Sequence, residues 1–164
     1  MSDSRPVLRV LFVCMGNICR SPTAEGMLRK RLQDEGIGDD VEVDSCGTGA
    51  WHVGQAPDPR AIRAASERGV DLSGLRGRQL TREDFAQFDE ILVMDTDNLD
   101  HVLALRPEDS CARVSRLLQY ANQPETDVPD PYFGGEAGFL HVLDQLELAV
   151  EGLTASLRQR VGGA

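Results

Sequence analysis

The sequence predicts an α/β protein with three layers, α/β/α, around a central four-stranded and mostly parallel sheet. Short apolar runs typical of buried strands alternate with segments whose apolar residues recur every three or four positions, as in helices. The first run, residues 7–13 (VLRVLFV), is nearly continuous, as in a strand covered on both faces. The chain of 164 residues suits a single domain, residues 1–164. Such sheets bind ligands beyond the carboxyl ends of their strands.

The first helix is expected directly after the first strand and a short loop. Ser21 can cap it and Pro22 suits its first position. Gly36 suits its end. Four apolar residues then share one face of this helix: Ala24, Met27, Leu28 and Leu32.

A short second strand is predicted at residues 41–43. It runs into the loop SCGTGAWHVGQAPD, which is rich in glycine and ends where Pro59 opens a second helix that reaches Gly69.

The middle of the chain predicts a short helix, a strand and a longer helix. Thr81 and the nearby Asp84 mark the start of the short helix, which carries two phenylalanines. The run DEILVMD, residues 89–95, is the clearest second buried strand, and a helix follows at about residues 98–105.

The last part predicts one more strand, a long loop and a final helix. Residues 113–117 form the weakest of the strand patterns. The loop NQPETDVPDPYFGGEAG is long for a compact domain, and such loops are often functional. The final helix has one apolar stripe for the core: Phe139, Val142, Leu143, Leu146, Val150, Leu153 and Leu157.

Composition limits the partners. A net charge of −10 argues against a nucleic acid or an anionic membrane surface as a main partner, because both would be repelled. The first residues contain no long apolar run after a basic segment, so we expect a soluble, cytoplasmic protein. Four cysteines in such a chain are expected to be reduced.

The loop CMGNICRSP is the strongest chemical signal. Cys14 stands where the first strand ends, and Arg20 stands where the Ser-Pro helix start begins. A helix N-terminus and a ring of loop N–H groups both favour negative charge, so we expect an anion site and a Cys14 thiolate at neutral pH. The guanidinium of Arg20 can hold two oxygens of a tetrahedral oxyanion such as phosphate. A thiolate beside a bound phosphate is a nucleophile aimed at phosphorus.

CMGNICRSPTAEG, followed by GTGAWHVGQAPDPRA, LVMDTDN and DPYFGG, resembles the low-molecular-weight protein tyrosine phosphatases over nearly the whole chain. The resemblance implies hydrolysis of phosphotyrosine monoesters. Cys14 would attack phosphorus to give a phosphocysteine, while Arg20 and the loop amides stabilise the transition state. Asp130 would protonate the leaving phenolate and then act as base on the hydrolytic water.

The resemblance also assigns supporting roles around the site. Ser21 would hydrogen-bond the thiolate, Asn17 would prop the loop, and Gly16 would give it conformational freedom. Trp51 and Tyr132, with Phe133 as a further candidate, match the aromatic walls around the substrate ring. No metal and no cofactor is expected. The expected substrate-binding residues are Met15, Gly16, Asn17, Ile18, Cys19, Ser21, Trp51 and Tyr132.

The remaining cysteines and Asp95 receive separate interpretations. The position of Cys19 in the family implies a disulfide with Cys14 that shields the nucleophile from irreversible oxidation. Cys46 and Cys111 are expected to be packing residues. Asp95, at the end of its strand and near the edge of the site, is expected to cap a helix.

One residue departs from the family pattern. Many relatives have a histidine that supports the loop asparagine, whereas this sequence has Leu75 there, with Arg76 or Arg78 as a substitute.

Three other functions stay open. An arsenate reductase on the same scaffold would need two further nearby cysteines. A protein arginine phosphatase typically has threonine where Ile18 stands, and the apolar Ile18 suits an aromatic ester better. A phospho-binding module without turnover would not need the acid. The implied partner is a phosphotyrosine protein, which in bacterial relatives is often an autophosphorylated tyrosine kinase of polysaccharide export.

Overall fold

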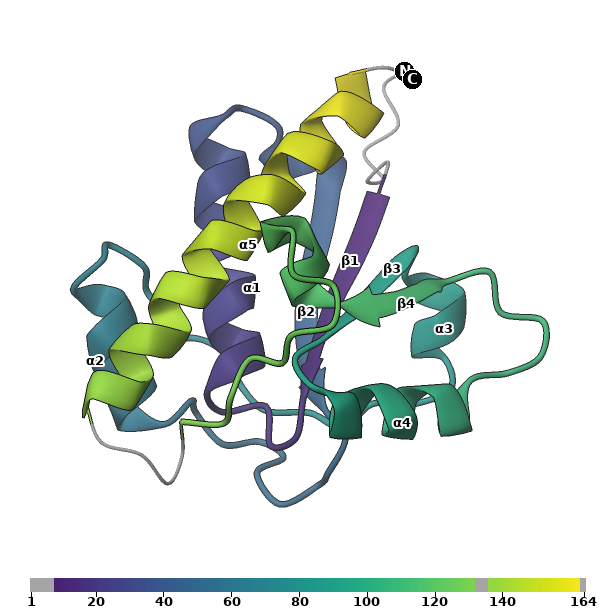
Figure 1. Ribbon diagram of the computed structural model, residues 1–164, viewed down its shortest axis with the longest axis horizontal. Coiled ribbons are helices and arrows are strands. Elements are labelled where there is room, and N and C mark those ends of the chain that lie inside the picture. The colour runs from purple at the N-terminus through teal and green to yellow at the C-terminus, as the bar shows by residue number, and fades with distance from the viewer. Residues whose placement is uncertain (1–7, 132–135, 163–164) are drawn as a thin grey trace.

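The computed structural model describes residues 8–131 and 136–162. Its four strands form one sheet in the order β2-β1-β3-β4, and every neighbouring pair is parallel (Figure 1). The predicted four-stranded parallel sheet is therefore confirmed. The strands are β1 (Leu8–Cys14), β2 (Val41–Gly47), β3 (Glu90–Val93) and β4 (Arg113–Arg116).

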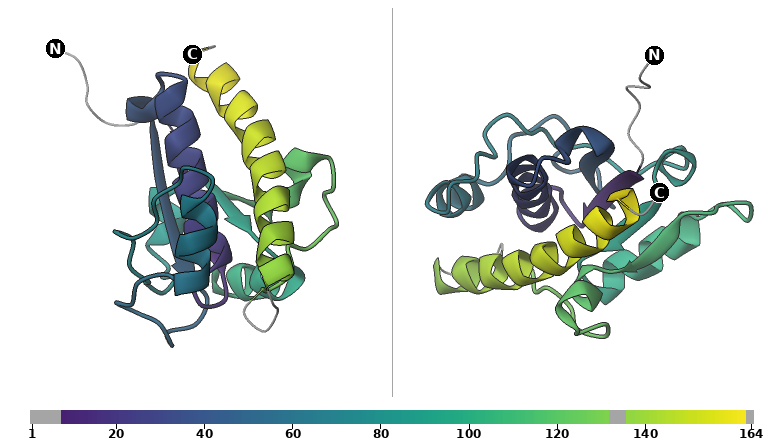
Figure 2. Two further views of the ribbon diagram at one scale, coloured as in Figure 1. Left: turned by 90° about the vertical axis from the view of Figure 1, so that its left-hand side faces the viewer. Right: turned by 90° about the horizontal axis from the view of Figure 1, so that it is seen from above.

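Helices cover both faces of this sheet and make three layers, as Figure 2 shows from two sides. The helices are α1 (Arg20–Asp34), α2 (Pro59–Ser66), α3 (Asp84–Gln87), α4 (Thr96–Leu105) and α5 (Glu136–Gly162), with short 3₁₀ turns η1 (Gly38–Asp40) and η2 (Leu117–Ala121). Alternate side chains of β1 enter different cores because successive residues of a strand point to opposite faces. Val10 and Phe12 pack in the core under α1, α2 and α5, whereas Leu11 and Val13 pack in the core under α3 and α4. None of the helices in the described ranges is long and apolar enough to cross a membrane.

Helix α5 is fastened to the sheet and to η2. Arg160 pairs with the fully buried Glu90 at 3.0 Å, and the Tyr120 hydroxyl donates to the same carboxylate. Burial and the neighbouring Glu90 raise the pKa of Tyr120 to about 12, so its hydroxyl stays protonated and keeps this hydrogen bond. A Cβ on Gly152 would lie 2.0 Å from the Tyr120 carbonyl oxygen, so only glycine allows this close packing.

The start of α1 differs from the prediction. The helix begins at Arg20 rather than after Ser21, and its N-cap, Cys19, makes no side-chain capping bond. Ser21 is not a cap because its hydroxyl contacts Cys14 Sγ and accepts from Asn17.

Other element boundaries also differ. β2 continues to Gly47 because its backbone pairs with β1 as far as Cys14, beyond the apolar residues 41–43 on which the prediction depended. β3 ends at Val93, since Asp95 accepts from the Asn98 backbone N–H and thereby starts α4. The predicted capping role of Asp95 is thus confirmed.

The packing prediction holds for only one of the two remaining cysteines. Cys46 is fully buried in the core under α3 and α4. For Cys111 the prediction is wrong: it lies exposed just before β4, where a polar turn connects α4 to the sheet.

Candidate active site

The loop between β1 and α1 lies against the end of β2 at the carboxyl edge of the sheet. The N–H groups of Thr48 and Gly49 donate to the carbonyl oxygens of Cys14 and Met15, at 2.9 and 3.0 Å. This close approach requires a residue without a side chain at the end of β2. A Cβ on Gly47 would lie 2.7 Å from the Met15 oxygen.

The substitution Gly47→Ala is therefore expected to displace the loop. We expect the free energy of unfolding to fall by about 1–3 kcal/mol, because the contact is with backbone that cannot rotate away. We expect kcat to fall by about tenfold, because the loop groups lose their alignment. Thermal unfolding and steady-state kinetics measure both effects. Gly74→Ala is the control, since no atom lies within 4 Å of its Cβ position; equal behaviour of the two variants would contradict the expectation.

Cys14 is the last residue of β1 and its side chain is almost fully enclosed. Its Sγ atom accepts a hydrogen bond from the Asn17 N–H at 3.3 Å and lies 3.0 Å from the Ser21 hydroxyl oxygen. One N–H donor and one hydroxyl, which also lies 3.3 Å from the Cys46 carbonyl oxygen, thus contact the sulfur. A sulfur in contact with polar groups at the start of a helix is placed to act as a nucleophile.

Asn17 holds the loop from behind. Its backbone has a φ of 58°, a left-handed conformation that asparagine tolerates. Its amide nitrogen donates to the hydroxyls of Ser21 (2.8 Å) and Ser45 (3.0 Å), and its amide oxygen accepts from the Arg78 backbone N–H at 3.0 Å.

This arrangement shows how Asn17 is supported although Leu75 stands where many relatives have a histidine. Leu75 is partly buried and packs on the core, and the amide oxygen of Asn17 is satisfied by the backbone of Arg78 rather than by a side chain. The Arg78 guanidinium instead pairs with Asp44 and Asp84, at 3.0 and 2.9 Å. The support of the loop asparagine is therefore complete without the histidine.

A buried carboxylate ends the same network. Ser45 donates to Glu25 at 2.7 Å, and Arg29 pairs with that carboxylate at 2.8 Å. Burial raises the pKa of Glu25, although the bonds from Ser45 and Arg29 counteract it. The hydrogen bonds run from Glu25 through Ser45, Asn17 and Ser21 to the sulfur of Cys14.

Arg20, the first residue of α1, is held in one position by segments distant in sequence. Its Nη1 donates to Asp95 at 2.6 Å and to the Val128 carbonyl at 2.9 Å. Burial alone would lower the pKa of Arg20, but the nearby Cys14 and Asp95 more than offset this and raise it. The guanidinium is a fixed cation in a residue that is only 2% exposed.

Asp130 lies on the other side of this arginine. Its Oδ2 is 3.9 Å from Arg20 Nη2, and its side chain is 30% exposed. The chain just before it is tied down, since the Val128 N–H donates to the Met94 carbonyl at 2.7 Å and the Val128 carbonyl accepts from Arg20. These bonds fix the position of the chain two residues before Asp130.

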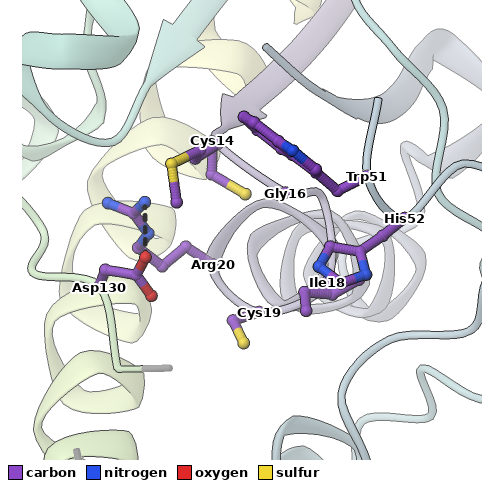
Figure 3. A pocket seen from close by; sticks show the side chains of 9 residues that line it. Cys14, Gly16, Ile18, Cys19, Arg20, Trp51, His52 and Asp130 are labelled. Atoms are coloured by element: carbon purple, nitrogen blue, oxygen red, sulfur yellow. Dashed lines mark ion pairs between the residues drawn. The ribbon is translucent and has the colours of Figure 1, made fainter. Parts of the chain in front are cut away.

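These groups surround one pocket of about 210 Å³, shown in Figure 3. Trp51, 70% exposed, forms one wall, and Asp130 stands on another side with Arg20. The lining consists of Cys14, Met15, Gly16, Ile18, Cys19, Arg20, Trp51, His52 and Asp130. Asn17 and Ser21 are buried and are not part of this lining, so they support the loop rather than face a ligand. Tyr132 and Phe133 lie outside the described residues.

Two residues of the site have no counterpart in the predicted site. His52 lines the pocket and Asp95 holds Arg20. The sequence could have indicated His52, because it directly follows Trp51 and neighbours in one loop often face the same pocket. The ion pair of Asp95 joins residues 75 positions apart, which local pattern does not reveal.

Cys19 remains a neutral thiol. Burial raises its pKa well above the ordinary value, and the nearby Asp58 and Cys14 raise it further. All four cysteines are free.

An enclosed thiol, a fixed guanidinium and a carboxylate around a small pocket at a helix N-terminus define a class of enzyme that transfers phosphoryl groups through cysteine. The family model of the low molecular weight phosphotyrosine protein phosphatases matches residues 9–162. The chain belongs to this family, whose members are phosphoric monoester hydrolases.

Relatives and solved structures agree with this assignment. A putative low molecular weight protein-tyrosine-phosphatase of Synechocystis is 44% identical over 152 residues, which are 92% of this chain and 96% of the relative. A protein tyrosine phosphatase structure from Entamoeba histolytica has a TM-score of 0.87 at 38% identity and covers 93% of this chain and 97% of its own. The structure of a Drosophila arginine phosphatase has a TM-score of 0.82 at 30% identity, covering 92% and 98%. The fold therefore does not separate the two substrates, and the pocket must do so.

Proposed function

We propose that this chain hydrolyses phosphotyrosine through a phosphocysteine on Cys14. The observation that carries the proposal is the placement of Cys14, Arg20 and Asp130 around one pocket at the start of α1. The Cys14 thiolate attacks phosphorus and the phosphorus–oxygen ester bond breaks, while Asp130 gives its proton to the departing tyrosine oxygen. Arg20 and the loop N–H groups bind the equatorial oxygens as charge shifts between them.

The second half of the reaction returns the enzyme to its start. Asp130, now a carboxylate, takes a proton from water, whose oxygen attacks phosphorus and releases inorganic phosphate. The sulfur leaves with the bonding electron pair, and the Ser21 hydroxyl, 3.0 Å away, donates to the departing thiolate. The hydrogen bond from Asn17, which is itself bonded to Ser45, holds this hydroxyl in place.

The pocket favours an aromatic ester over the alternatives. Ile18 and Trp51 give it apolar walls, which suit a phenyl ring better than a guanidinium. A thiol relay for arsenate reduction would need further cysteines beside Cys14. Cys46 is instead buried in the core under α3 and α4, and Cys111 lies exposed before β4.

Parallel assays test this substrate choice. Phosphate release is followed from peptides with phosphotyrosine, phosphoarginine or phosphoserine in the same sequence, and arsenate reduction is measured with a thiol donor. We expect the phosphotyrosine peptide to have the highest kcat/KM. A faster phosphoarginine peptide, or thiol-dependent arsenate reduction, would replace the proposal with the corresponding alternative.

The acid role of Asp130 predicts a dependence on the leaving group. Asp130→Asn should lower kcat by about 10²-fold for phenyl phosphate, whose leaving group needs a proton. For p-nitrophenyl phosphate, whose leaving group departs as a stable anion, the loss should be several-fold smaller. An equal loss for both substrates would assign Asp130 to phosphate binding rather than proton transfer. Asp127→Asn, in the same loop but outside the pocket lining, is the control.

Three further assignments belong to this proposal. Residues 1–164 form one phosphatase domain, which the family match over 9–162 supports. The chain works in the cytoplasm, because its catalytic thiol must stay reduced. Its substrates are phosphotyrosine proteins, and in a bacterial host a tyrosine kinase is the candidate. A protective disulfide between Cys14 and Cys19 stays a prediction; the neutral, buried Cys19 would act only after Cys14 is oxidised.

A further inference from the structure

The hydrogen-bond network behind the loop has a direction that one backbone group sets. The backbone N–H of Arg78 can only donate, so the Asn17 atom that it contacts at 3.0 Å is the amide oxygen. The amide nitrogen of Asn17 therefore points to the hydroxyl oxygens of Ser21 and Ser45, at 2.8 and 3.0 Å. Because both oxygens accept these bonds, each serine can direct its own hydrogen to a further acceptor.

Glu25 is the further acceptor for Ser45. The residue is buried, and its two carboxylate oxygens have different partners. Oε1 accepts from the Ser45 hydroxyl at 2.7 Å, whereas Oε2 accepts from Arg29 Nε at 2.9 Å. An ionised carboxylate accepts on both sides, but an amide carries a donor on one of them. This end of the network is therefore built for a carboxylate.

The other end of the network is the sulfur of the nucleophile. The Ser21 oxygen lies 3.0 Å from Cys14 Sγ and 3.3 Å from the Cys46 carbonyl oxygen, so its hydrogen has two acceptors within reach. A charged acceptor forms the stronger hydrogen bond. When the phosphorus–sulfur bond of the phosphocysteine breaks, negative charge develops on the sulfur, and the hydrogen bond from Ser21 to it strengthens.

We propose that Glu25 is a positioning residue for the hydrolysis of the phosphocysteine: its carboxylate takes the hydrogen of Ser45, so that the Asn17 amide stays aligned and holds Ser21 toward the departing sulfur. This inference rests on the proposed function. Hydrogen bonds in series polarise and strengthen one another inside a protein, so an acceptor at one end affects the donor at the other. Since Leu75 replaces the histidine of many relatives, the network of this chain ends at Glu25.

Glu25→Gln tests the proposal directly. Arg29 also donates to the Val43 carbonyl, so it stays in place and keeps the amide oxygen of the glutamine, and the amide nitrogen then faces Ser45. Two N–H groups would compete for the Ser45 oxygen, and the Ser45 hydrogen would lose its acceptor. We expect hydrolysis of the phosphocysteine to slow about fivefold, while its formation stays within about twofold of the wild-type rate.

Rapid mixing with p-nitrophenyl phosphate measures the two steps separately. The burst of p-nitrophenol gives the rate of phosphocysteine formation, and the linear phase that follows gives the rate of its hydrolysis. A role that is only structural would misalign the loop and slow both steps together. Ser45→Ala removes the link between Glu25 and Asn17 and should give the same selective loss, so the test does not depend on one variant.

A comparison with Ser21→Ala shows whether Glu25 acts through Ser21. Ser21→Ala should slow hydrolysis at least as much as Glu25→Gln does. The double variant Ser21→Ala/Glu25→Gln should then be no slower than Ser21→Ala alone, because the effects of residues in one network do not add.

Glu90→Gln is the matched control, since Glu90 is also a buried carboxylate that is bonded to a hydroxyl and to an arginine. It is the first residue of β3, at the edge of the sheet opposite the loop. The variant should lower the midpoint of thermal unfolding but leave both steps at their wild-type rates.

Two outcomes would overturn the inference while leaving the proposed function intact. In the first, Glu25→Gln and Ser45→Ala hydrolyse the phosphocysteine at the wild-type rate, or slow its formation as much as its hydrolysis. In the second, the double variant is several-fold slower than Ser21→Ala alone. A wild-type enzyme that is inactive on every substrate refutes the proposed function instead.

Discussion

Cys14→Ser is expected to lower kcat for a phosphotyrosine peptide by at least about 10⁴-fold, because a serine hydroxyl has no base beside it to make it a nucleophile. The groups around the sulfur are an N–H and a hydroxyl, which stabilise a thiolate but do not take a proton from serine. The replacement oxygen is smaller and keeps the same two partners. We therefore expect the loop to keep its shape.

Three measurements check this expectation. Steady-state kinetics give the loss of turnover, calorimetry gives the Kd of inorganic phosphate, and thermal unfolding gives the midpoint. Phosphate should still bind within a few-fold of the wild type, since Arg20 and the loop amides remain. Cys111→Ser, which removes an exposed thiol outside the pocket, should be indistinguishable from wild type. Turnover by Cys14→Ser within tenfold of wild type would rule out the phosphocysteine mechanism.

Arg20→Lys is expected to lower kcat/KM by about 10³-fold although it keeps the charge. Arg20 uses one nitrogen to hold Asp95 and the Val128 carbonyl, and a lysine has only one nitrogen for all of these and the phosphate. A lysine that pairs with Asp95 therefore no longer binds the phosphate of the substrate. A lysine that turns to the substrate leaves Asp95 and the Val128 carbonyl unpaired.

Steady-state kinetics and phosphate binding separate the loss of turnover from the loss of affinity. We expect both a lower kcat and a weaker affinity for phosphate, because the guanidinium binds the ground state and the transition state. Arg63→Lys, at an exposed position of α2, is the control and should leave both unchanged. If Arg20→Lys kept kcat/KM within tenfold, bidentate binding of the phosphate by this residue would be excluded.

The fold was predictable from the sequence where hydrophobic pattern and topology coincide. The continuous apolar run of β1 predicts a central strand, and β1 indeed has a neighbour on each side. β2 extends four residues past its apolar pattern because backbone pairing with β1, which local sequence does not encode, continues it. The start of α1 was misplaced because Ser21 looks like a cap, whereas its hydroxyl is engaged by the sulfur of Cys14.

The candidate site divides in the same way. Cys14 and Arg20 belong to one contiguous loop, so their meeting was predictable from spacing. The meeting of Arg20 with Asp95, and of Asn17 with the backbone of Arg78, depends on which strands neighbour each other in the sheet.

The double attachment of Val128 determines how far Asp130 can travel. Val128 is bonded to Met94 through its N–H and to Arg20 through its carbonyl, and Asp130 stands two residues later. Only Pro129 separates the anchored Val128 from the acid. One inserted residue would add about 3.8 Å of contour, more than the whole distance over which a proton donor can work. An insertion between Val128 and Asp130 should therefore not be tolerated.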